Sequence, residues 1–140
     1  MWKRLPLLLA LLAPSCAIDN TPEEYIQTIQ ANYLHVPEPI IVTLWEEWPA
    51  LDGEDVRWVR STIHYNKAHG NWIVNLNWTW WEGATHSERV MTLSHELCHT
   101  VYDHDVLIPD LWYALEPGEW EFRQKRARHC AGDILRRMAQ

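Results

Sequence analysis

The sequence lacks an excess of positive charge. Its 12 lysine and arginine residues are outnumbered by 19 aspartate and glutamate residues, which gives a formal net charge of −7 at pH 7. Nucleic-acid binding needs basic patches that meet phosphate groups, so this composition argues against that class of protein. The basic residues that do occur gather late in the chain, at Arg123, Lys125, Arg126, Arg128, Arg136 and Arg137. They are expected to form a solvated face of a C-terminal helix.

Long hydrophobic runs are scarce as well. Residues 5–13 are apolar, but a membrane-spanning helix needs about 20 such residues. Basic residues precede this stretch and small residues follow it, which predicts an export leader over residues 1–17. The leader is either a secretory signal peptide cleaved after Ala17 or a lipoprotein leader that makes Cys16 a lipid anchor. An apolar N-terminal strand or tail is the alternative.

The location of the protein depends on this leader. Export would make it periplasmic, secreted or lipid-anchored, and the anchor is its only expected contact with a membrane. Without export the protein would be cytoplasmic.

Cysteine is also rare, with three residues. After removal of the leader, Cys98 and Cys130 can form a disulfide in an oxidising compartment, or remain two small buried residues.

Internal repeats, low-complexity segments and long linkers are absent from the sequence, so residues 18–140 predict a single domain, expected to be monomeric. Helix starts, apolar alternation and turn residues mark its elements. Helices are predicted at residues 21–34, from Thr85 onward, at 109–115 and at 119–138; strands are predicted at 40–45, 56–65 and 71–78, with a turn at 49–54 and a hairpin loop at 66–70. This order predicts an α+β fold in which a small sheet packs beside two helices.

Tryptophan, by contrast, is abundant. The chain has ten, most of them between Trp45 and Trp81. Aromatic residues suit strands and half-buried surfaces, so packing is the favoured interpretation. The alternative interpretation is a groove that is lined by aromatic residues and binds peptide or sugar.

The most informative stretch is the H-E-x-x-H run His95-Glu96-Leu97-Cys98-His99. Residues four apart share one face of a helix, so both imidazoles can bind one Zn²⁺ ion while Glu96 takes a proton from water. A capping box of Thr85 and Glu88 predicts the helix start. Apolar residues then recur at helical spacing, at Val90, Leu93, Leu97 and Val101. The alternative is a helix that carries two surface histidines.

A catalytic zinc ion usually has three protein ligands. The preferred third ligand is Glu119, which opens the last helix and lies at the edge of the face that carries Ala127. The fallbacks are Asp105, His104, Glu116 and Glu121. Asp105 fits a metzincin spacing, but Tyr102 stands where that pattern needs glycine. Any of these acidic residues can instead be a solvated helix N-terminus.

The H-E-x-x-H run resembles the zincin clan of metallopeptidases. The late stretch from Ala127 to Leu135 is similar to the end of ImmA/IrrE-type minimal gluzincins, although Gln124, Lys125 and Arg126 stand where that family has acidic residues. The resemblance implies a minimal zincin-like domain: an N-terminal helix, a small sheet with a β-hairpin, the H-E-x-x-H helix and a C-terminal helix.

The predicted activity is zinc-dependent hydrolysis of a peptide or protein, as an endopeptidase rather than an exopeptidase. Zn²⁺ lowers the pKa of water and Glu96 acts as general base. Candidates to stabilise the oxyanion are Tyr102, Tyr113, His104 and His129. Asp103 or Asp105 would orient an imidazole, and the edge of the strand at 71–78 would bind extended substrate.

Two other functions remain open. A non-catalytic, exported zinc-binding module would hold the metal with four protein ligands and no open position. A regulatory protease would act on a single protein partner and would need the N-terminal stretch not to be an export signal.

Overall fold

The computed structural model describes residues 20–46, 59–103 and 115–140. In these parts the chain is α+β, with four helices and a three-stranded sheet, which confirms the predicted class. The elements are α2 (Pro22–Asn32), β1 (Ile40–Trp45), β2 (Ser61–Asn66), β3 (Asn71–Asn77), α3 (Trp78–Gly83), α4 (His86–Tyr102) and α6 (Glu119–Met138). The predicted leader, the turn at 49–54 and most of the helix at 109–115 lie outside the described residues. None of the helices described is long and apolar enough to span a membrane.

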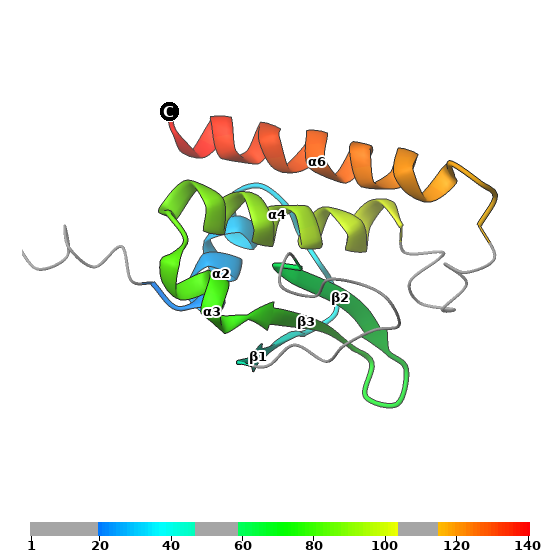
Figure 1. Cartoon of the computed structure of the whole chain (residues 1–140), viewed down its shortest axis with the longest axis horizontal. Coiled ribbons are helices and arrows are strands. Elements are labelled where there is room, and N and C mark those ends of the chain that lie inside the picture. Colours follow the sequence, from blue (N-terminus) through cyan, green and yellow to red (C-terminus); the bar gives the residue numbers. More distant parts are fainter. Residues whose placement is uncertain (1–19, 47–58, 104–114) are drawn as a thin grey trace, which may run out of the picture.

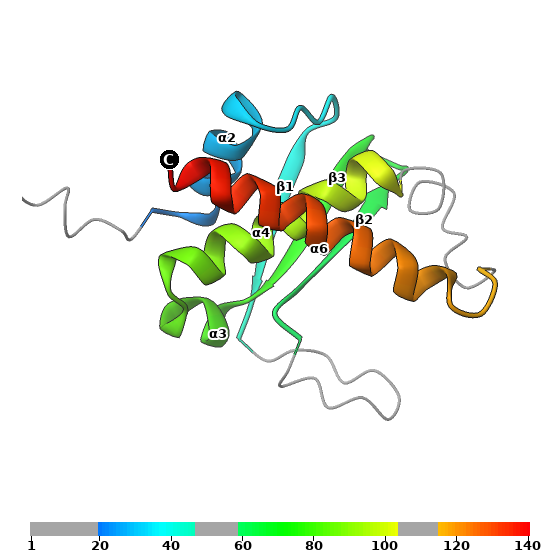
Figure 2. The same cartoon turned by 90° about the horizontal axis from the view of Figure 1, so that it is seen from above.

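The helix α4 forms the middle layer of the molecule. Figure 1 shows α6 on one side of α4 and the sheet on the other, with α4 and α6 running in opposite directions. Figure 2, seen from the α6 side, shows α6 crossing over α4. The disulfide Cys98–Cys130 joins these two helices, so the structure adopts the paired state rather than two free thiols. Any site on α4 can therefore draw residues from both neighbouring layers.

The sheet has the strand order β1-β3-β2. The central strand β3 pairs in parallel with β1 and antiparallel with β2. Its alternating Trp72, Val74 and Leu76 are fully buried, as the period-two pattern predicts. Because β3 is paired on both sides, the expectation that its edge binds substrate is wrong. Within the described sheet β2 is an edge strand, and Ser61 at its start contacts Glu96 of α4.

The hairpin between β2 and β3 forms at residues 66–70, as predicted. Gly70 has a φ of 65°, in the left-handed region that glycine adopts without strain. Its N–H donates to the carbonyl oxygen of Asn66 at 2.8 Å. The preceding strand β2 begins at Ser61, so Val59 and Arg60 lie before it rather than in the strand as predicted, and residues 56–58 of that prediction lie outside the described residues.

The segment after β3 differs from the prediction of a strand that extends to Trp78. Asn77 instead caps the short helix α3, and its side chain accepts the N–H of Trp80 at 3.2 Å. Asparagine favours helix N-caps because its side chain satisfies a free backbone N–H. The packing of Trp81, which is 3% exposed, then holds α3 against the core.

The start of α4 follows its capping residue. The Thr85 side chain accepts the N–H of Glu88 at 3.2 Å, as the capping box predicts. Of the predicted apolar face, Val90, Leu93 and Leu97 are fully buried, but Val101 is 45% exposed. The buried apolar residues therefore end at Cys98, and the buried residues of the last turn, His99 and Thr100, are polar.

Candidate active site

The two histidines of the motif lie one turn apart on α4, and their rings approach each other. The Nε2 atoms of His95 and His99 are 3.0 Å apart, and the ring centroids are separated by 4.7 Å. Both nitrogen atoms thus meet on one face of the helix, which is the arrangement that the i, i+4 spacing predicts.

A glutamine from the neighbouring helix completes this cluster. Oε1 of Gln124 on α6 lies 2.8 Å from Nε2 of His95 and 3.2 Å from Nε2 of His99. Two donor atoms bound to one tetrahedral zinc ion at about 2.0–2.1 Å are themselves roughly 3.3 Å apart. The three atoms are therefore close to the spacing of a metal-binding triad.

Asp103 fixes the ring of His99. Its Oδ2 atom lies 2.5 Å from Nδ1 of His99, while its Oδ1 atom accepts hydrogen bonds from Arg123 at 3.0 Å and Arg126 at 2.9 Å. A carboxylate in this position selects the tautomer that carries the proton on Nδ1. The Nε2 atom of neutral His99 then directs a lone pair at the cluster.

The charges around His99 shift three pKa values. Burial raises the pKa of Asp103, but the hydrogen bonds from His99 and Arg123 outweigh it, so the net shift is downward. Burial lowers the pKa of His99, but Asp103 and Glu96 outweigh it and the net shift is upward. Burial and the adjacent His99 lower the pKa of His95 to about 4. His95 is therefore neutral at pH 7 and keeps a lone pair for a ligand.

Glu96 lies beneath this cluster, on the side of the sheet. It is buried, and its Oε1 atom accepts a hydrogen bond from the hydroxyl of Ser61 at 2.8 Å. Burial raises the pKa of Glu96, while His99 and Ser61 oppose the shift. A carboxylate of this kind holds a proton more readily than an exposed one, which suits an acid–base role.

One pocket adjoins this site and includes His95, Glu96 and Gln124 in its lining, but not His99. It has a volume of about 540 Å³ and is lined by Val59, Arg60, Ser61, Met91, Thr92, His95, Glu96, Gln124 and Arg128. Its walls come from the start of β2, from α4 and from α6. The site is thus open to a ligand where the three layers meet.

The other predicted site residues lie elsewhere or outside the described chain. The carboxylate of Glu119, the preferred third ligand, pairs with Arg123 at 3.0 Å. The two acidic fallbacks on either side of it, Glu116 and Glu121, are exposed. Tyr102 and His129 line a different pocket. The remaining candidates, His104, Asp105 and Tyr113, fall outside the described residues.

Gln124 and Trp120 are the site residues that sequence reasoning missed. Trp120 stacks on His99, with ring centroids 5.6 Å apart and planes inclined by 10°. The signal for Gln124 was its position one helical turn before the buried Ala127, on the face that meets α4. The candidates for the third ligand were mainly carboxylates, so Gln124 was overlooked.

Two of the three clustered atoms are imidazole nitrogens, which are common zinc ligands, and Asp103 hydrogen-bonds to the other ring nitrogen of His99. The third atom is an amide oxygen, which is not among the usual ligands of zinc. Within the described ranges, no group of three or more His, Cys, Asp and Glu side chains is placed to hold a metal. The third atom in this cluster belongs to a glutamine, whose neutral oxygen is a weaker ligand than a carboxylate.

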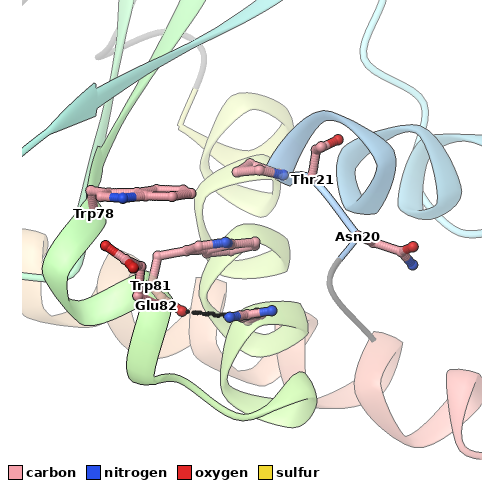
Figure 3. Close-up of a pocket in the computed structure, with 7 residues that line it drawn as sticks. Asn20, Thr21, Trp78, Trp81 and Glu82 are labelled. Carbon is pink, nitrogen blue, oxygen red and sulfur yellow. Dashed lines mark hydrogen bonds between the residues drawn. The ribbon is translucent and has the colours of Figure 1, made fainter. Parts of the chain in front are cut away.

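A second pocket lies at the other end of α4. It has a volume of about 320 Å³ and is lined by Asn20, Thr21, Pro22, Trp78, Trp81, Glu82 and Arg89. Figure 3 shows the indole rings of Trp78 and Trp81 one above the other, with Thr21 and Asn20 on the facing side. Arg89 donates to the carbonyl oxygen of Trp81 at 2.8 Å.

Trp72 and Trp81 are both buried, so packing accounts for these two tryptophans.

Comparisons of the chain with protein-family models, with curated proteins and with solved structures found no match.

Proposed function

We propose that the protein is a zinc-dependent metallopeptidase of the zincin type. The observation that carries the proposal is the 3.0 Å approach of the Nε2 atoms of His95 and His99, beside a pocket that also contains Glu96. Two converging imidazoles and a buried carboxylate are the groups that metal-assisted hydrolysis requires.

His95, His99 and Gln124 would hold the metal. When bound, Zn²⁺ supplies Lewis-acid chemistry that acidifies water and polarises a carbonyl group. Asp103 keeps the Nε2 atom of His99 turned toward the cluster through its bond to Nδ1. The described residues bring three such atoms together, and three protein ligands rather than four would favour a hydrolase over a purely structural zinc module.

Glu96 would move the proton. Ser61 occupies its Oε1 atom, which leaves Oε2 as the oxygen that accepts a proton from water and delivers it to the leaving amine. Burial raises the pKa of Glu96, which favours the protonated form that donates to the leaving amine. The hydrogen bond from Ser61 fixes the carboxylate in the pocket.

The outer edge of β2 would bind the substrate. This strand begins at Ser61, next to Glu96, and within the described residues it pairs only with β3. An extended peptide can add to such an edge through backbone hydrogen bonds. Its scissile bond would then lie beside the two histidines, which supports cleavage within a chain.

The disulfide supports an exported location for this peptidase. Disulfides persist in oxidising compartments and are rare in the cytosol. The pair Cys98–Cys130 therefore favours the export leader over a regulatory protease that acts on a cytosolic partner.

A single substitution tests the proposed activity. In Glu96→Gln, zinc binding should persist while hydrolysis of casein or of a fluorogenic peptide falls by at least about a hundredfold, because the proton acceptor is removed. Zinc content and turnover are measured on the same preparation. The matched control is Glu82→Gln, an exposed carboxylate on α3, which should retain full activity. Undiminished turnover by the zinc-loaded Glu96→Gln protein would refute the assignment.

A further inference from the structure

Two guanidinium groups stand on opposite walls of the pocket that contains His95 and Glu96. Arg60 directly precedes β2, and Arg128 lies on α6 one turn after Gln124; both line this pocket. Both are exposed. Among the lining residues that the structure describes, the only carboxylate is that of Glu96, which is buried and already bonded to Ser61.

These two arginines differ from others on the described surface. Arg123 and Arg126 bind Asp103, and Arg136 binds Asp133. Neither Arg60 nor Arg128 forms an ion pair with any residue that the structure describes. Arg60 rests on the ring of Trp80, 5.3 Å from its centroid, which holds its position without neutralising its charge.

The charge of the pocket contrasts with that of the chain. The whole sequence carries a formal charge of −7, yet the two exposed charged residues in the described lining of this pocket, Arg60 and Arg128, are both positive. A positively charged cleft on an acidic protein concentrates anionic ligands at its mouth.

We propose that this site selects acidic peptides, with Arg60 and Arg128 binding a substrate carboxylate next to the scissile bond. The inference rests on the proposed peptidase function and names its substrate class. A guanidinium offers a planar fork of donors that matches a carboxylate. A peptide lying along β2 would pass between the two arginines, since they come from the two walls that flank Glu96.

Peptide binding to the zinc-loaded Glu96→Gln protein tests this selection. The probes are dansylated, C-terminally amidated alanine hexapeptides that carry Glu, Gln or Lys at each position in turn. At the best position, the Glu peptide should bind about three- to tenfold more tightly than the matched Gln peptide, because each partly exposed ion pair contributes modestly. The Lys peptide should bind most weakly.

Substitution of the arginines identifies the source of the preference. Adding Arg60→Gln and Arg128→Gln should make the Glu and Gln peptides bind equally, while Arg128→Lys should retain part of the preference. Arg136→Gln, outside the pocket, is the matched control and should change nothing. Equal binding of the two peptides by the protein with both arginines, including no detectable binding of either, would overturn the inference.

Hydrolysis separates this inference from the proposed function. The unsubstituted protein is assayed with the same peptides by mass spectrometry. A binding preference for Glu that depends on both arginines, without cleavage of any peptide, would contradict the peptidase but not the acidic site. Cleavage of Glu and Gln peptides at equal rates would contradict the acidic site alone.

Discussion

At the scale of single residues, the site depends on which atoms face one another. Nε2 of His95, Nε2 of His99 and Oε1 of Gln124 lie within 3.2 Å of one another. If the Nδ1–H group of neutral His99 donates a hydrogen bond to Asp103, its Nε2 atom carries a lone pair, as Oε1 of Gln124 does. A proton on Nε2 of His95 is then the single proton shared by the three atoms of the cluster. A cation would satisfy the remaining lone pairs, which is the physical basis for proposing a metal at this cluster.

The role of Gln124 predicts a graded effect on zinc affinity. Gln124→Ala should weaken zinc binding at least about tenfold, since loss of even an outer partner of a metal ligand costs that much. Gln124→Glu should strengthen it, because a carboxylate adds charge at the same position. Competition with a chromophoric chelator measures both, and Gln27→Ala on α2 is the control. If all three variants bind zinc as the unsubstituted protein does, Gln124 is not a ligand.

The environment of His95 predicts an unusual titration in the metal-free protein. Burial and His99 lower its pKa from 6.5 to about 4. The folded protein therefore binds this proton less tightly than the unfolded chain does, so acidification from pH 6.5 toward 4 should favour unfolding through this residue. NMR of the imidazole C2 proton should give a midpoint near 4, and a midpoint near 6.5 would contradict the buried environment.

At the scale of elements, the site depends on the alignment of α4 with α6. The helix α4 supplies His95, Glu96 and His99, whereas α6 supplies Gln124 and the two arginines that hold Asp103. The disulfide Cys98–Cys130 fixes one helix against the other next to these groups. The ligand cluster thus exists only while the two helices keep their register.

Removal of the disulfide should therefore affect both stability and the site. Cys98→Ser combined with Cys130→Ser should lower the free energy of unfolding by about 2–4 kcal/mol, as expected for the loss of a native cross-link. It should also weaken zinc binding, because Gln124 is then held less firmly beside the histidines. Urea denaturation and chelator competition measure the two effects. A variant that matches the unsubstituted protein in both would show that the cross-link is dispensable.

At the scale of the whole molecule, local sequence signals predicted most elements but not their assembly. The caps at Thr21 and Thr85, the alternation of β3 and the bounds of α6 follow from residues close in sequence. The short helix α3 was missed because strand-like aromatic residues outweighed the cap at Asn77.

Local sequence patterns could not predict the contacts between segments that are distant in the sequence. The parallel pairing of β1 with β3 joins segments some thirty residues apart, and nothing in either strand specifies its neighbour. The histidines of the site could be predicted because one helix turn brings them together. Gln124 could not be assigned in this way, since its contact depends on how α6 packs across α4.

Zinc titration of the purified, metal-free protein by isothermal calorimetry tests the central claim most directly. The unsubstituted protein and Glu96→Gln should each bind one zinc ion per chain. His95→Ala and His99→Ala should lose that binding, while His69→Ala, in the hairpin loop, should retain it. Zinc affinity that is absent in the unsubstituted protein, or unchanged in both histidine variants, would contradict a metal site on α4.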